Sequence, residues 1–276
     1  MIQELLITIK KEYTEHTAPP VWIRDTITPA DINAIRDESS IPATTAQSFM
    51  KQTAEIRSSL WEKWLQKEAT IQSYTCKEGR VLVISIDPIQ PPQSWIRIFR
   101  LLNPGQVAQV IWFASDEERI APAEGAPIEA IHINGGYAQK CNPRSIVVYR
   151  KEEATRVLIH ELLHASCSDP GGSLPYIESD TEAWAEITLI GLKAKGIQRA
   201  FAPLWKDHAY YATKQAVSAK QFHNVQSDTD YSYRYLVGRL ATFKRLGLPL
   251  PKIDTLSRQI KSLRLTDKKL ELIDGN

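Results

Sequence analysis

The stretch that decides the fold and chemistry of this chain is "VLIHELLHASCSDP", which runs from Val157 to Pro170. In an α-helix, residues i and i+4 lie one turn apart on the same face, so His160 and His164 point the same way. Two imidazoles at this spacing can hold one zinc ion, while the carboxylate of Glu161 can reach a nearby water but not easily the metal. The stretch therefore predicts half of a zinc site, with two ligands and a general base on one turn.

A helix that carries two unrelated histidines is the alternative interpretation. In a chain with this histidine content, the HExxH pattern arises by chance in roughly one case per hundred. In an all-helical scaffold of that kind, His160 and His164 would share no metal ion. Cys167 lies just beyond His164 and is a further possible ligand, although a thiolate is typical of closed structural sites.

A third ligand is expected from the next helix, because a catalytic zinc ion takes three protein ligands and keeps one position open. Beyond His164 the chain turns through "SCSDPGGSLPYIESD" and enters a predicted helix at 179–195, where Glu182 and Glu186 lie one turn apart. We expect Glu182 to be the third ligand and Glu186 to accept a hydrogen bond from the outer N–H of a ligand histidine. The alternative is that both carboxylates simply face water.

The pattern on either side of this site predicts an α+β fold. Residues 1–79 are expected to be helical, with Thr28 as an N-cap, Pro29 as the first residue of one helix, and another helix at 44–69. Further along, the expected strands are 80–87, 106–114, 128–135 and 145–150, and the expected helices are 91–103, 152–166, 179–195, 202–222, 229–246 and an amphipathic piece from 254.

These elements suggest a helical N-terminal extension at 1–79 and one domain at 80–276. Within that domain, residues 80–168 would form a small mixed β-sheet with the active-site helix, and residues 169–276 would form a helical subdomain. The N-terminal helices could cover a cleft, dock a protein partner or complete the core.

Composition narrows the classes of partner. The 34 Lys and Arg residues nearly balance the 32 Asp and Glu residues, so there is no electrostatic reason to expect nucleic acid or a membrane surface. The N-terminus lacks the charge order of a signal peptide. Cys76, Cys141 and Cys167 are odd in number and widely spaced, which favours free thiols in a reducing, cytoplasmic compartment.

The order of an HExxH helix, a loop and a helix with a glutamate resembles the gluzincin metallopeptidases, such as thermolysin and the zinc aminopeptidases. "HELLH" and the later "TEAWAE" carry the resemblance, with one residue fewer between them than in the aminopeptidases. It implies a zincin-like fold and one Zn²⁺ held by His160, His164 and Glu182, with Glu161 as the base. The C-terminal half is also similar to uncharacterised zinc peptidases of large DNA viruses.

The resemblance also implies a substrate-binding edge. In gluzincins the strand before the HExxH helix pairs with the extended substrate. "NGGY", at 134–137, resembles the substrate-edge segment of thermolysin, which suggests Asn134, Gly135 and Tyr149 as substrate contacts and 145–149 as the strand that holds the substrate. A plain turn is the alternative for "NGGY".

Gluzincins use a Tyr or His from a later helix to stabilise the oxyanion of the tetrahedral intermediate. By this resemblance the segment "DTDYSYRYLVGRLATF" supplies Tyr233 as the favoured catalytic candidate. The other candidates are Tyr231, Arg234, Tyr235, His208, Tyr211 and His223.

Together these features predict a zinc metallopeptidase that acts on a peptide or protein substrate. Glu161 would take a proton from the attacking water and pass it to the leaving amine. Because the GAMEN segment of the aminopeptidases is absent, trimming of free N-termini is not expected. Two alternatives remain open. One is a zincin-fold protein without turnover that serves in an assembly, for example in a virus particle; the other is a zinc-dependent hydrolase of a different bond.

Overall fold

The computed structural model describes residues 1–40, 51–103 and 105–272. These residues form a mixed α and β structure with two compact units that interleave along the chain. The helical unit comprises Met1–Thr17, Arg119–Ile133 and Ser168–Leu272, and the sheet unit comprises Ala18–Glu118 and Asn134–Cys167.

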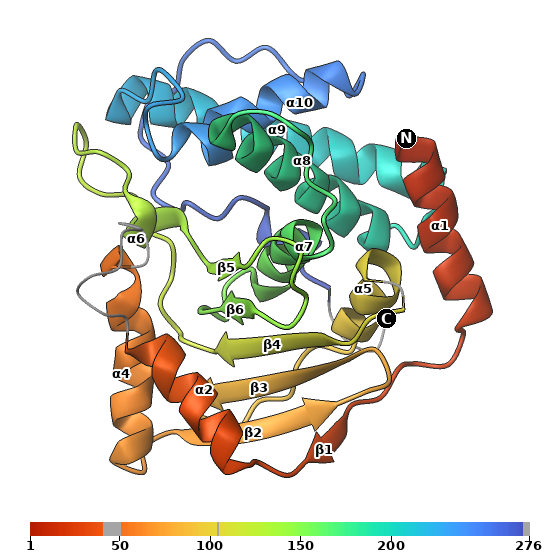
Figure 1. Ribbon diagram of the computed structural model, residues 1–276. Coiled ribbons are helices and arrows are strands. Elements are labelled where there is room, and N and C mark those ends of the chain that lie inside the picture. Colours follow the sequence, from red (N-terminus) through yellow and green to blue (C-terminus); the bar gives the residue numbers. More distant parts are fainter. Residues whose placement is uncertain (41–50, 104, 273–276) are drawn as a thin grey trace. The chain divides into compact units, whose positions relative to one another are not determined.

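The sheet unit is built on one small mixed sheet (Figure 1). The strand order is β1-β2-β3-β4-β6-β5. Strands β3, β4 and β6 run parallel to one another, while β1, β2 and β5 are each antiparallel to their neighbours. Their bounds are Ile23–Asp25 for β1, Thr70–Thr75 for β2, Gly79–Ser85 for β3, Ala108–Phe113 for β4, Gly136–Ala138 for β5 and Ile146–Val148 for β6.

Both faces of the sheet are covered by helices. Successive side chains of a strand point to opposite faces, yet every residue from Val81 to Ile84 in β3 is fully buried. Helix α5 (Ser94–Leu102) packs against α7 (Ala154–Ala165), and Trp95 of α5 lies 5.0 Å from Trp112 of β4, ring centre to ring centre. Helix α4 (Ala54–Leu65) packs against β3, β4 and α2 (Pro29–Ser39).

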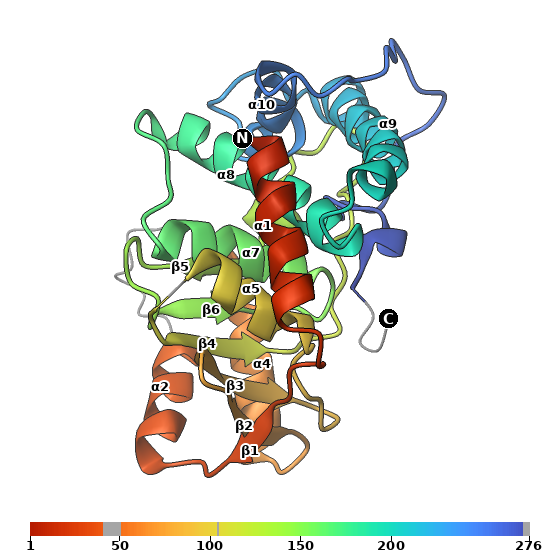
Figure 2. The ribbon, with the colours of Figure 1, turned by 90° about the vertical axis from the view of Figure 1, so that its right-hand side faces the viewer.

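The helical unit is organised around α8 (Leu174–Lys193), which contacts most of its other elements. Figure 2 shows α1 (Ile2–Glu15) alongside α8. A side chain at Gly191 would meet Ile9, so the glycine permits this close approach of α1. The remaining elements are α6 (Ala130–Ile133), α9 (Gln198–His223), the π-helix η1 (Arg234–Gly238), α10 (Arg239–Arg245) and the 3-10 turn η2 (Lys268–Leu270).

Several predicted elements are confirmed by the structure. Thr28 caps α2 in a reciprocal box: its hydroxyl accepts from the backbone N–H of Asp31, and the Asp31 carboxylate accepts from the N–H of Thr28. The strands expected at 80–87, 106–114 and 145–150 are β3, β4 and β6. The helices expected at 91–103 and 152–166 are α5 and α7.

Three predicted segments are wrong. Residues 1–79 are not all helical, because they contain β1 and β2, and the residue-80 boundary falls inside the β2–β3 hairpin. The strand expected at 128–135 contains the short helix α6 instead. The amphipathic piece from 254 is extended up to η2, because its backbone bonds to the segment near residue 120 through Ala121 N–H to Lys261 O and Leu263 N–H to Arg119 O.

Two further expectations concern segment limits. The helix predicted at 44–69 is represented by α4, and residues 44–50 lie outside the described part of the chain. The sheet unit ends at Cys167, next to the division expected after residue 168. Among the helices of the described ranges, none has the length and hydropathy that crossing a membrane requires.

Candidate metal centre

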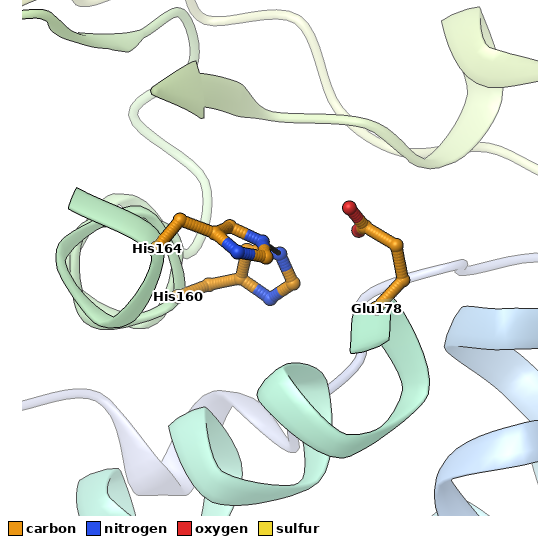
Figure 3. Close-up of side chains that lie close together, drawn as sticks. All are labelled: His160, His164 and Glu178. Carbon is orange, nitrogen blue, oxygen red and sulfur yellow. Dashed lines mark hydrogen bonds between the residues drawn. The ribbon is translucent and has the colours of Figure 1, made fainter. Parts of the chain in front are cut away.

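The two histidines of "HELLH" converge on one face of α7. His160 and His164 are separated by one turn, and their Nε2 atoms lie 3.1 Å apart (Figure 3). His160 is almost fully buried and His164 is half-buried. The chain therefore brings both predicted histidine ligands together within the sheet unit.

The spacing of the two nitrogens fits a tetrahedral zinc ion. With Zn–N bonds of roughly 2.0–2.1 Å and a tetrahedral angle, two ligand nitrogens lie about 3.3 Å apart. The observed 3.1 Å is close to this value, although the same separation also suits a hydrogen bond between the rings. The imidazole pair thus has the donor atoms and the geometry that zinc requires of two of its ligands.

Glu161 lies directly beside strand β5. A methyl group added at Gly136 of β5 would lie 3.2 Å from Cγ of Glu161 and 2.6 Å from Cγ1 of Val157, both on α7. Only glycine lets the strand come so close to the helix, because any Cβ would collide with Val157. The predicted base is consequently held next to a strand backbone. The second glycine of "NGGY" was the sequence signal for this contact.

Strand β5 is an edge of the sheet, whereas β6 is not. β6 is paired on one side with β4 and on the other with β5, so its backbone is already used in the sheet. The prediction that residues 145–149 hold an extended substrate is therefore wrong. The outer side of β5, at the edge of the sheet next to α7, is the position where another strand could pair.

The three predicted substrate contacts, Asn134, Gly135 and Tyr149, are hydrogen-bonded to one another and to β5. The Tyr149 hydroxyl donates to Oδ1 of Asn134 at 2.5 Å, and the same oxygen accepts from the backbone N–H of Gly136 at 3.0 Å. The backbone N–H of Tyr149 donates to the carbonyl of Gly135 at 2.9 Å. Because Tyr149 is fully buried, its place in the structure is to brace the edge strand.

Arg57 packs against two tyrosine rings of this hydrogen-bonded region, those of Tyr137 and Tyr149. Its guanidinium is fully buried and lies 5.4 Å from the ring centre of Tyr137 and 5.0 Å from that of Tyr149. The Tyr137 hydroxyl donates to Glu38, and burial together with the Glu38 charge raises the pKa of Tyr137 well above its usual value. A sequence offers no signal for this contact, since Arg57 and Tyr137 are far apart along the chain.

A disulfide between Cys141 and Cys167 corrects the expectation of free thiols. It joins the loop after β5 to the end of α7, where the backbone N–H groups of both cysteines donate to the carbonyl of His164. It also removes Cys167 as a candidate metal ligand. Cys76 is free, and burial raises the pKa of its thiol to about 11.

Three glutamates stand four residues apart on α8, so they share one face of that helix. They are Glu178, which is half-buried, and Glu182 and Glu186, which are buried. Helix α8 begins at Leu174, five residues before the predicted start at residue 179, so Glu178 belongs to this row as well. The sequence would have revealed it if the spacing had been extended one turn backwards.

Glu186 has partners other than the predicted ligand histidine. Its Oε2 lies 2.7 Å from Nε2 of His208, and its Oε1 accepts from Arg239, all fully buried. Burial raises the pKa of Glu186, against the lowering effect of Arg239 and His208. Glu186 therefore anchors the core of the helical unit.

Tyr235, and not Tyr233, is hydrogen-bonded to one of the three glutamates of α8. The Tyr235 hydroxyl donates to Oε2 of Glu178 at 3.0 Å, while Tyr233 precedes η1 and packs against an apolar cluster. Burial and the charge of Glu178 raise the pKa of Tyr235, which keeps the phenol protonated as a donor. The other oxyanion candidates also have structural partners. His208 bonds to Glu186, Tyr211 to the carbonyl of Arg264, and His223 to Ala126 and Gln259. The Arg234 guanidinium lies 5.0 Å from the ring centre of Tyr231.

His160 and His164 belong to the sheet unit, whereas Glu178 and Glu182 belong to the helical unit. The expected third ligand, Glu182, lies one turn beyond Glu178 on α8, and its role stays a prediction. Comparison of the chain with protein-family models, curated proteins and solved structures gives no match.

Proposed function

We propose that this chain is a zinc-dependent hydrolase of peptide bonds. The observation that carries the proposal is the arrangement on α7: two imidazole nitrogens lie 3.1 Å apart, and Glu161, between the two histidines in sequence, lies against an edge strand. The histidine pair supplies two zinc ligands, Glu161 supplies a base, and β5 supplies a backbone on which an extended peptide can pair. All three features belong to one compact unit.

The gluzincin resemblance implies that Glu182 is the third ligand, and this assignment stays a prediction. Histidine and carboxylate ligands together are typical of catalytic zinc sites that keep one position open. When bound, zinc would polarise the peptide carbonyl and lower the pKa of a water ligand from about 15.7 toward 7.

The residues of the chain then carry the proton and hold the substrate. Glu161 takes a proton from the attacking water and delivers it to the leaving amine, as a general base and then a general acid. The outer edge of β5 binds the substrate by backbone hydrogen bonds, which orient an extended peptide regardless of sequence. Asn134, Tyr149 and Arg57 keep β5 in place without touching the substrate.

The test compares the wild-type chain with Glu161→Gln and His160→Asn. We expect wild type to bind one equivalent of zinc by elemental analysis and to cleave members of a mixed peptide library detected by mass spectrometry. Glu161→Gln should keep the zinc and lose about 10²–10⁴-fold in rate, because a positioned base contributes that much. His160→Asn should lose both zinc and cleavage.

Other outcomes decide between the alternatives. Zinc binding without cleavage of any peptide, in a chain with Glu161 intact, would favour a protein without turnover or a hydrolase of another bond. A wild-type chain that cannot be loaded with zinc would contradict the proposal altogether, and the 3.1 Å contact would then be a hydrogen bond between two histidines.

A further inference from the structure

We infer that the disulfide between Cys141 and Cys167 is a redox-sensitive switch that controls how tightly the histidine pair of α7 binds a metal ion. Both cysteines and both histidines belong to the sheet unit. The inference rests on the proposed zinc site and adds a means by which metal binding there is regulated.

The backbone carbonyl of His164 is the point where both cysteines contact α7. His164 is the last residue but one of this helix, and the last four carbonyls of a helix have no partner within it. The backbone N–H of Cys167 donates to the His164 carbonyl at 3.2 Å, and that of Cys141 donates to the same oxygen at 3.1 Å. The disulfide therefore joins the two residues whose amides hold the last turn of α7.

Both cysteines have a left-handed backbone conformation, which is costly for a residue with a Cβ. Their φ angles are 60° for Cys141 and 59° for Cys167. Cys167 occupies the position after the helix C-cap, where glycine is the usual residue. Conformations of this kind persist only while the surrounding structure enforces them. Cleavage of the disulfide therefore lets the turn relax and release the His164 carbonyl.

The disulfide is accessible to a reductant. Cys141 and Cys167 are both exposed, and exposed disulfides are typically labile or regulatory. The thiolate of a dithiol attacks one sulfur and releases the other as a thiol, and the second thiol of the dithiol then breaks the mixed disulfide. Two electrons and two protons pass to the cysteines, and the dithiol becomes a disulfide.

Reduction weakens metal binding because the last turn of α7 opens. His164 binds a metal ion together with His160 only while the helix keeps the two residues on one face. A last turn that is helical in about a tenth of the reduced molecules lowers the apparent affinity about tenfold, because the competent fraction sets that affinity. Cys141 lies between β5 and β6, so reduction also removes a covalent tie between α7 and the proposed substrate edge.

The experiment measures the zinc affinity of the full-length Cys76→Ser chain, in which Cys141 and Cys167 are the remaining cysteines. Competition with a chromophoric chelator gives the affinity before reduction, after reduction by a phosphine, and after reoxidation. A phosphine is used because dithiols themselves bind zinc. Alkylation followed by mass spectrometry counts the free thiols in each state.

The triple variant Cys76→Ser, Cys141→Ser, Cys167→Ser is the matched control, because it can neither form the disulfide nor bind zinc through sulfur. Circular dichroism confirms that it is folded. We expect reduction to weaken zinc binding about tenfold and reoxidation to restore it. The triple variant should bind zinc as weakly as the reduced chain, and the phosphine should not change its affinity.

The inference is overturned if the triple variant binds zinc as tightly as the oxidised chain, or if reduction leaves the affinity unchanged or raises it. It is also overturned if alkylation finds free thiols at Cys141 and Cys167 without reductant. If the triple variant fails to fold, the affinities before and after reduction still decide the outcome.

Failure of the proposed function gives a different result. The chain would then bind no zinc in either redox state, or His160→Asn would bind zinc as tightly as wild type, and either result overturns the switch as well. Zinc binding that depends on His160 but not on the redox state overturns the switch alone.

Discussion

At the scale of single residues, Gly136 controls how closely strand β5 approaches the histidine helix. A methyl group there would lie 2.6 Å from Cγ1 of Val157 and 2.7 Å from the carbonyl oxygen of Val147. We expect Gly136→Ala to lower the free energy of unfolding by about 1–3 kcal/mol, because overpacking forces the strand and helix apart. It should also reduce peptide cleavage, since Glu161 lies at the same contact.

Urea denaturation measures this change, and Gly171→Ala is the matched control. A methyl group at Gly171 would meet nothing within 4 Å, so this substitution should leave the stability nearly unchanged. Equal stability of the two variants would show that β5 and α7 are not in such close contact.

A second residue, Asp31, makes stability depend on pH. Burial alone would raise the pKa of its carboxyl, but hydrogen bonds from Arg80 and Thr28 outweigh burial and hold the pKa below its usual value of 3.8. A lowered folded-state pKa stabilises the protein above pH 3.8, and this contribution is lost as the pH falls through the folded-state value.

We therefore expect Asp31→Asn to lower the free energy of unfolding by about 1–3 kcal/mol at pH 7, as for hydrogen bonds to a charged group. Below the folded-state pKa of Asp31 the difference in stability from wild type should vanish, because the side chain at position 31 is then neutral in both proteins. Denaturation series at pH 7 and at the lowest pH where wild type folds provide the comparison. A difference that is independent of pH would contradict the role of the charge.

At the scale of elements, the Cys141–Cys167 disulfide ties the loop after β5 to the last turn of α7. The two cysteines are 26 residues apart, and a loop of this length corresponds to about 3.5 kcal/mol in the chain-entropy model. We expect the double variant Cys141→Ser, Cys167→Ser to lose about that much stability and to exchange the amides near His164 faster, measured by urea denaturation and hydrogen exchange.

Cys76→Ser is the control for this variant, because Cys76 is the cysteine outside the disulfide. Its substitution should change neither quantity appreciably. If reducing agent and the double serine variant both leave wild-type stability unchanged, the two thiols are not joined in the purified protein.

Elements with a strong local pattern could be predicted from the sequence, and elements defined by their partners could not. Helix α7 and strand β3 have the periodicity and the β-branched residues that mark their type. Strands β1 and β5 have three residues each, so they exist only because a neighbouring strand pairs with them. The run at 128–135 is rich in strand-forming residues, yet its tertiary surroundings favour α6.

In the candidate site too, some residues could be predicted from local spacing and others could not. His160, Glu161 and His164 are encoded within a single helical turn, so their spacing alone predicted them. The contacts of Gly136 with α7 and of Tyr235 with Glu178 join segments that are far apart in sequence. The sequence shows a glycine at position 136, but no local pattern indicates the partner in either contact, because the partners depend on how the elements pack.

At the scale of the whole molecule, the chain passes repeatedly between the two units. The sheet unit takes strands from both sides of residue 80, and the helical unit takes α1 from the N-terminus and α8 to α10 from the C-terminal part. A fragment that starts at residue 80 would therefore lose elements of both units.

We expect the fragment 80–276 not to fold as a stable domain. Without β2, the backbone of β3 loses its pairing on one side, and without α4 the residues Val81–Ile84 lose cover from a helix that packs on β3. Exposure of a buried side chain of this size costs roughly 1.5–3 kcal/mol, so a few of them exceed the stability of a typical domain. Loss of α1 also exposes the surface of α8 at Gly191.

Near-ultraviolet circular dichroism and urea denaturation distinguish the outcomes, with the full chain as reference. The fragment should lack the fixed aromatic signal and a cooperative transition, and mixing it with a 1–79 fragment should restore both, because the missing strands and helices pair non-covalently. A fragment that unfolds cooperatively by itself would instead establish residues 1–79 as an independent extension. The β2–β3 hairpin would then be dispensable for the sheet that holds α7, and the proposed zinc site could be studied without the N-terminal segment.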